Sequence, residues 1–428
     1  MGKKRKLEEP KREFTRRQLS QWQRQKRRQR LFLILGISVI AAVAGIIGRG
    51  WYVGQYLPMH EVVIRVNDTE FNMGYYIKML EISGGNYPEY LPYLTDQVVT
   101  IIEENELIRQ GAEGAGVTAT NSEVDDMLKQ FDHPVNQCYR DLMRAEILSG
   151  KVRDVYLDSL VPTSAEQRHI MAMFLESESQ ANEVRDRLKG GEDFGTLAGE
   201  LSLDSLTQTQ KGDLGWHPYG ILSETMGTSI PDDYAFTMTV GALSQPLYDE
   251  TKTKSVGYWL VKVVDKNEEE QKYKLQVMLL GSEQEAQEVI TRLENGEDFA
   301  TVAEELSQDS GSKDKGGDLG SVTADEINSV YKDFVINAEP ETLSQPIKDD
   351  SVTTKGGYWL VEVLEKEDNK QIESSDRDIL KAKVLDEWIS SLWDNPDNKV
   401  ESYLDNDKKA WAVDEATKFI TKQGGLGQ

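Results

Sequence analysis

A long internal duplication is the feature that most limits how this chain can fold. The blocks EDFGTLAGELSLDS, GDLGW, LSQPL and GYWLV occur in that order within residues 192–261. The blocks EDFATVAEELSQDS, GGDLG, LSQPI and GYWLV follow within residues 297–361. The second copy trails the first by 105 residues at Gly317 but by 100 at Ser344. Because solenoid repeats are only ~20–50 residues long, this period indicates a duplicated domain with one shortened loop.

Composition and cysteine usage narrow the class of protein. A length of 428 residues suffices for about three domains at roughly 150 residues each. The single cysteine, Cys138, excludes an internal disulfide and a cysteine-based metal cluster. The four histidines are not at metal-ligand spacing, and they are His60, His133, His169 and His217. We therefore expect no metal site and no cofactor.

Charge is divided unevenly along the chain. The first 30 residues hold 13 of the 49 Lys and Arg residues but only three of the 74 Asp and Glu residues. The remainder is strongly acidic, and the whole chain carries a formal net charge of −25. Nucleic-acid binding needs a basic footprint, so we expect no nucleic-acid partner.

An uncharged stretch follows the basic tail. LFLILGISVIAAVAGIIG, residues 31–48, would reach ~27 Å as a helix, close to the ~30 Å hydrocarbon core of a bilayer. The positive-inside rule predicts a cytoplasmic tail over 1–30, a single transmembrane helix over 31–53 that contacts membrane lipid, and an extracytoplasmic body. A cleaved signal peptide is the alternative, although its apolar region is usually only ~7–15 residues long.

Residues 57–165 have the pattern of a small helical module. Alternation over 61–68 predicts a short strand, and apolar spacing over 94–116 predicts a long helix. Thr120 or Asn121 is expected to cap the next helix. The apolar stripes are expected to form a core, with a client-binding groove as the less favoured interpretation.

Each copy of the repeat has the pattern of an α+β domain. In the first copy, residues 168–175 predict a strand, residues 179–201 predict two helices, and GYWLVKVV predicts a closing strand. Helices lying on a small antiparallel sheet are the expected arrangement. A later helix carries Trp388 and Trp393, which are too large to remain exposed without a reason, so this helix must dock against another surface.

The repeated motifs resemble the parvulin family of peptidyl-prolyl cis–trans isomerases. The motifs are DFA-x-x-A-x-x-x-S-x-D, GGDLG, G-x-x-S-x-P and G-Y followed by an apolar residue. VIRVND and GVTATNSEVD resemble the chaperone domain of SurA- and PrsA-type extracytoplasmic folding factors. The resemblance implies a helical SurA-like chaperone domain at 57–165, parvulin-like domains at 166–267 and 272–369, and a C-terminal helical segment at 370–428 that docks on the chaperone domain.

The resemblance also implies a proline-binding site in each copy. Rotation about an X–Pro bond faces a barrier of ~18–20 kcal/mol but makes no new bond, so a site must grip the ring and favour the twisted amide. Asp204 and Asp309 match the family's catalytic position. The matched or proposed substrate-binding walls are Leu214, Leu222, Phe236 and Trp259 in the first copy, and Leu319, Ile327, Tyr331 and Trp359 in the second. In most proteins such leucines would be ordinary core residues.

Both copies depart from the family at its two histidine positions. Ala172 and Val277 occupy the first position, and tryptophan occupies the second. His169 lies three residues before Ala172, an odd offset that places it on the opposite face of a strand. Three functions therefore compete. The favoured one is a membrane-anchored isomerase that assists folding of unfolded or proline-containing exported polypeptides. The others are a parvulin-fold holdase with weak or no catalysis and a scaffold with one stable partner.

Overall fold

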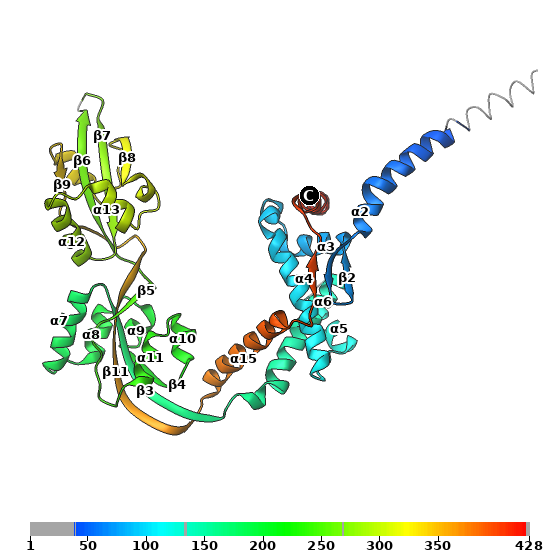
Figure 1. Ribbon diagram of the computed structural model, residues 1–428, viewed down its shortest axis with the longest axis horizontal. Helices are drawn as coiled ribbons and strands as arrows, with labels where there is room; N and C mark the ends of the chain where they lie inside the picture. Colours follow the sequence, from blue (N-terminus) through cyan, green and yellow to red (C-terminus); the bar gives the residue numbers. More distant parts are fainter. Residues whose placement is uncertain (1–37, 39, 132–134, 268, 425–428) are drawn as a thin grey trace, which may run out of the picture. The chain divides into compact units, whose positions relative to one another are not determined.

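The computed structural model describes residues 38, 40–131, 135–267 and 269–424, which fall into two compact units (Figure 1). The first unit combines Met1–Val152 with Glu387–Gln428, and the second is Arg153–Asp386. Among the described residues, none of the helices combines the length and apolar character needed to cross a membrane. Residues 31–37 and 39 of the predicted transmembrane helix lie outside the described residues.

Helices dominate the first unit. Its elements are η1 (Tyr52–Tyr56), α2 (Leu57–His60), β1 (Val62–Val66), β2 (Thr69–Asn72), α3 (Met73–Gly84), η2 (Pro88–Tyr90), α4 (Leu91–Gly114), α5 (Asn121–Gln130), α6 (Gln137–Lys151), the end of α15 (Ser374–Asp394), β12 (Val400–Ser402) and α16 (Asn406–Gly424). Helix α5 begins at a capping box in which the Thr120 and Glu123 side chains each accept from the other residue's backbone N–H. The predicted cap at Thr120 is therefore confirmed.

The C-terminal segment contributes to the core of the first unit. Strand β12 pairs antiparallel with β1, with Val400 opposite Val66. Trp393 and Trp411 pack against the apolar cluster that contains Tyr76. The docking surface expected for the tryptophan-bearing helix thus exists from Glu387 onward, whereas residues 370–386 belong to the second unit.

The second unit contains two antiparallel sheets with helices packed on them. Its remaining elements are η3 (Val152–Tyr156), η4 (Asp158–Leu160), β3 (Ser164–Leu175), α7 (Glu178–Lys189), α8 (Phe194–Leu201), α9 (Ser205–Thr209), β4 (Asp213–Pro218), α10 (Ile221–Met226), α11 (Ile230–Thr237), β5 (Leu247–Lys254), β6 (Gly257–Asn267), β7 (Lys272–Leu280), α12 (Glu283–Glu294), α13 (Phe299–Leu306), η5 (Lys313–Lys315), β8 (Asp318–Thr323), α14 (Lys332–Asn337), β9 (Thr342–Leu343), β10 (Ile347–Asp349) and β11 (Thr354–Gln371). The predicted α+β class is confirmed.

The same local signals start the matching helices of both copies. Ser177 caps α7 and Ser282 caps α12, each by accepting from a backbone N–H three residues on. Asp193 and Asp298 cap α8 and α13 in the same way. These caps satisfy N–H groups that have no partner inside the helix, so the duplication is preserved at the level of local structure.

The closing strands of the two copies are exchanged between the sheets. The first sheet has the order β4-β3-β11-β5, and the second has β10-β6-β7-β8 with β9 also paired to β6. Strand β11 runs beside β3, with Val361 opposite Ala172, and β6 runs beside β7, with Val261 opposite Val277 (Figure 1). The first sheet is therefore completed by the second copy, and the second sheet by the first copy.

Because of this exchange, the closing strand inside each of the predicted limits, 166–267 and 272–369, lies in the sheet of the other copy. A short connection lets β6 and β7 form a hairpin, whereas the sequence limits divide them. Both closing strands carry GYWLV, so either one presents the same alternation of side chains to either sheet. Pattern alone could not assign the strands.

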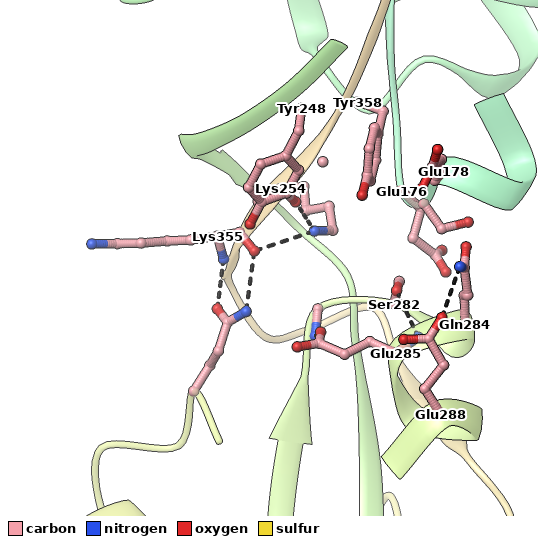
Figure 2. A pocket seen from close by; sticks show the side chains of 15 residues that line it. Glu176, Glu178, Tyr248, Lys254, Ser282, Gln284, Glu285, Glu288, Lys355 and Tyr358 are labelled. Atoms are coloured by element: carbon pink, nitrogen blue, oxygen red, sulfur yellow. Dashed lines mark hydrogen bonds between the residues drawn. The ribbon is translucent and has the colours of Figure 1, made fainter. Parts of the chain in front are cut away.

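Glycines permit close packing where the strands cross. A Cβ on Gly357 would meet the Phe174 ring and lie 2.7 Å from the Leu175 carbonyl oxygen. Beside them is a cavity of about 230 Å³ lined by both copies (Figure 2). Lys254 is buried there, its ammonium donates to the Gly356 carbonyl, and burial lowers its pKa to about 8.

Replacing Gly357 with alanine is expected to destabilise the second unit by about 1–3 kcal/mol, because the added methyl overpacks a fixed backbone contact. Gly150→Ala is the matched control, since a Cβ at Gly150 in α6 would meet nothing within 4 Å. The control should be neutral or stabilising by up to ~1 kcal/mol. Denaturant unfolding measures both changes, and equal effects of the two substitutions would argue against the tight crossing.

Candidate functional site

The first sheet carries a buried apolar cluster that includes three of the predicted wall residues. Leu214 and Leu222 share this cluster with Trp359, and Phe236 packs against it. The Trp359 side chain is 0% exposed, and its Nε1 donates to Asp249 Oδ2 over 3.0 Å. The indole is therefore buried within this cluster and fixed in orientation.

Asp204, the predicted catalytic residue of the first copy, is held in an ion pair. Its Oδ2 lies 2.8 Å from Lys252 Nζ, and its Oδ1 accepts from the Thr207 N–H at the start of α9. Burial by itself raises the pKa of Asp204, but the Lys252 ammonium and the Thr207 donors outweigh it and hold the pKa below its usual range. The Lys252 ammonium also lies 5.5 Å from the centre of the Trp359 ring.

The second sheet builds the equivalent cluster around Trp259. Ile327 and Tyr331 share it, and half-buried Leu319 packs against it. The Trp259 and Tyr331 ring centroids are 5.4 Å apart with the planes 63° apart. Trp259 Nε1 donates to Asp349 Oδ2 over 3.0 Å. The two inclined aromatic rings and the two aliphatic side chains thus form one apolar corner.

Asp309 differs from Asp204 in its surroundings. It is half-buried, and its Oδ2 accepts from the Ser312 hydroxyl. The position equivalent to Lys252 is Val352, which packs against the apolar cluster. Among the ion pairs of the described residues, Asp204 pairs with the Lys252 ammonium, whereas the Asp309 carboxylate has no such pair. Asp309 and Leu319 are thus more exposed than Asp204 and Leu214, whereas Trp259, Ile327 and Tyr331 are buried.

The structure corrects the assignment of the two tryptophans. From the sequence, Trp259 was expected to complete the first site and Trp359 the second. Because the closing strands are exchanged, Trp359 lies beside Leu214 in the first sheet, and Trp259 lies beside Tyr331 in the second. The remaining predicted walls stay within the sheet of their own copy.

Sequence reasoning missed three polar residues at these sites. Asp249, Asp349 and Lys252 were not among the predicted residues, although the first two match at the same 100-residue offset as Ser344. Burial alone raises the pKa of Asp249, but donors from Thr228, Trp359 and Thr251 outweigh it and lower the pKa. The pKa of Asp349 is lowered in the same balance, by donors that include Trp259. Comparing the copies residue by residue could have found the aspartate pair.

The histidines of the second unit are engaged elsewhere. His169 Nε2 lies 2.8 Å from Asp213 Oδ1, and its ring stacks on Trp216. This agrees with the predicted placement on the strand face opposite Ala172. His217 contacts Asp376 and the Leu214 carbonyl, each at 2.7 Å. Within the described part of the chain, no group of three or more His, Cys, Asp or Glu side chains could hold a metal ion.

Comparison with known families matches both copies. The family described as PPIC-type PPIASE domain matches residues 169–265, and a second family of the same description matches residues 258–367. The two matches overlap within β6, the closing strand of the first copy, which lies in the second sheet.

Relatives are found among bacterial chaperones. The chain is 23% identical to Chaperone SurA of Nitrosococcus oceani over 81% of this chain and 78% of that protein. It is 36% identical to Foldase protein PrsA of Clostridium kluyveri, over 28% of this chain and 38% of that protein. A solved structure of PrsA from Bacillus anthracis aligns over 82% of this chain and 98% of its own, with 12% identity and a TM-score of 0.26.

These matches agree with the structure at the level of its parts. Each matched region contains the sheet strands and covering helices of one repeat copy, and a helical unit precedes them. The chain therefore belongs to the SurA and PrsA type of folding factors and carries two parvulin-type peptidyl-prolyl isomerase domains.

Proposed function

We propose that this chain is a membrane-anchored, extracytoplasmic foldase that speeds the isomerisation of X–Pro bonds in exported polypeptides at the site beside Trp259. The observation that carries the proposal is the contrast between the two sites. Asp309 and Leu319 are half-buried next to an aromatic corner, whereas Asp204 is ion-paired with Lys252 and Leu214 is only 7% exposed.

The second site has the chemistry that the reaction needs. Half-buried Leu319, which packs against the buried cluster of Trp259, Tyr331 and Ile327, offers apolar contact to a pyrrolidine ring. A planar amide carries more negative charge on its carbonyl oxygen than a twisted one, since twisting removes resonance. A carboxylate near that oxygen, such as Asp309, therefore disfavours the planar form more than the twisted one and lowers the barrier by differential binding.

Peptide isomerisation by the full chain tests this proposal. We expect Leu319→Ser to lower kcat/KM for a proline tetrapeptide about tenfold, because losing a leucine wall removes at least ~1.5 kcal/mol of apolar contact. Leu214→Ser, the same change at the matching position of the first copy, should have the smaller effect. The reverse order would move the activity to the first site, and a rate equal to the uncatalysed one would remove the isomerase proposal.

A holdase is the second candidate, because one observation favours it. The fully buried Trp359 indole and the Lys252–Asp204 ion pair occupy the first site, so the first domain need not turn over substrate. A holdase without catalysis would suppress aggregation of an unfolded client equally well before and after Leu319→Ser. It would leave the isomerisation rate of the proline peptide at the uncatalysed value.

The membrane anchor is proposed from the sequence of residues 1–53. An uncharged stretch of 18 residues after a basic tail is long enough to span a bilayer as a helix. We expect the full chain to remain with membranes during alkaline carbonate extraction and a chain lacking residues 1–53 to be released. Release of the full chain would remove this part of the proposal.

A further inference from the structure

We infer that Asp249 and Asp349 are positioning residues, each of which holds the indole supplied by the other repeat copy in the apolar cluster of its sheet. In the second sheet, that indole is the buried wall of the proposed proline-binding site. The role of the wall in isomerisation rests on the function proposed above for the second site. The cross-supply itself rests on strand pairing and hydrogen bonds, and can be tested without any activity.

Strand order determines which tryptophan reaches which aspartate. Asp249 lies on β5, which pairs with β11, so that Leu247 is opposite Trp359. Asp349 lies on β10, which pairs with β6, so that Ile347 is opposite Trp259. In each sheet the aspartate comes from one copy and the indole from the other.

Both aspartates are built as fixed acceptors. Each is 3% exposed, and one carboxylate oxygen of each accepts an indole N–H over 3.0 Å. The second oxygen of Asp249 accepts from the Thr251 N–H and hydroxyl, and that of Asp349 accepts from the Ser351 N–H and hydroxyl. A buried carboxylate held by neutral donors on both oxygens has little freedom to turn, so the indole bonded to it is also fixed.

The same residues would allow a different arrangement. If each copy kept its own closing strand, Asp249 would face Trp259, and Asp349 would face Trp359, through identical chemical groups. The energies of individual contacts therefore do not distinguish the two arrangements, whereas the identity of the partner does. In the exchanged arrangement, a copy cut at its sequence limits loses its wall, so the two sites are assembled together.

Engineered disulfides can show which strands are neighbours, because a disulfide forms only between residues that lie close together. Met171 is opposite Glu362 across β3 and β11, whereas an unexchanged sheet would put Lys262 opposite Met171. Directly opposed residues of antiparallel strands have Cα atoms ~4.5–5.5 Å apart, within the range that a disulfide spans. In a full chain carrying Cys138→Ala, we expect Met171→Cys with Glu362→Cys to form an intramolecular disulfide.

The matched variant carries Met171→Cys with Lys262→Cys and should remain reduced under the same oxidation. A disulfide in this variant instead would overturn the inference, because it would require the unexchanged sheet. A disulfide-linked dimer of the Glu362→Cys variant would also overturn it, because the exchange would then join two chains.

Fluorine NMR of the chain labelled with 5-fluorotryptophan reports on the hydrogen bond between each indole and its aspartate. Trp259→Phe and Trp359→Phe assign the two resonances among the eight tryptophans. We expect Asp349→Ala to move the Trp259 resonance and leave that of Trp359 in place, and Asp249→Ala to do the opposite. A crossed result, in which Asp349→Ala moves Trp359, would overturn the inference.

Kinetics distinguish positioning from simple support of the fold. Freeing the Trp259 indole should raise KM for a proline peptide more than it lowers kcat, because the indole supports Leu319, the side chain proposed to contact the ring. A chain that shows the expected disulfide and fluorine results but no isomerisation would lose the proposed function and keep the cross-supplied walls. An Asp349→Ala chain that binds and turns over peptide normally, despite a moved Trp259 resonance, would overturn the positioning role.

Discussion

Replacing Trp359 with alanine is expected to lower the free energy of unfolding of the second unit by about 3–5 kcal/mol. Truncating a fully buried tryptophan removes its apolar contacts and leaves a cavity that the surroundings fill only in part. It also leaves Asp249 Oδ2 without the indole donor. Although Trp359 follows the second GDLG motif in sequence, the damage should fall on the first sheet.

Hydrogen exchange resolved by peptide measures where the damage falls. Amides of β3, β4 and β5 should exchange faster in the Trp359→Ala chain, while those of β7 and β8 change less. Trp216→Ala is the control within the same sheet, because Trp216 on β4 is only half-buried and should cost less. Faster exchange confined to β7 and β8 would contradict the strand assignment.

Replacing Lys252 with methionine is expected to cost about 3–5 kcal/mol at neutral pH, because it leaves the Asp204 carboxylate buried without its partner. The pH dependence has a definite sign. In the unmodified chain the pKa of Asp204 is lowered, so its stabilisation is present above the unfolded pKa of ~3.9 and is lost as the pH falls below that value. In the variant, burial raises that pKa, so the deficit should shrink as the pH falls.

Denaturant unfolding at several pH values measures this change. Adding Asp204→Asn to Lys252→Met should recover much of the loss at neutral pH, since a neutral amide replaces the unpaired charge. Lys262→Met is the matched control, because its partner Glu341 is exposed and such surface pairs contribute ~1 kcal/mol or less. A Lys252→Met deficit as small as that of the control would show that the buried pair does not stabilise the first site.

Local features of the fold could be predicted because local residues determine them. Thr120 indicates a helix start, and the local pattern of residues 179–201 indicates two helices. The duplication predicted two related α+β domains for the same reason. Which sheet receives which GYWLV strand could not be predicted, because the choice depends on contacts between distant segments and both strands fit both sheets.

The sequence predicted the apolar residues of the candidate sites but not the ion pair and hydrogen bonds that hold the site residues in place. Leu214, Leu319 and Tyr331 lie in the apolar clusters that the motifs indicated. Lys252 could not be paired with Asp204 from spacing, because the two residues are 48 positions apart and meet only after the sheet forms. The sequence shows that both family histidines are replaced. Only the structure shows that an aspartate accepts a hydrogen bond from each tryptophan that lies in the histidine position.

Each candidate site takes its tryptophan from the closing strand of the other repeat copy. NMR of a chain with labelled alanine and valine methyl groups can detect which valine lies next to Ala172 on β3. The substitutions Val361→Ile and Val261→Ile identify the two valine signals. We expect a nuclear Overhauser effect between Ala172 and Val361, which are directly opposed in the first sheet. An effect between Ala172 and Val261 instead would contradict the strand exchange.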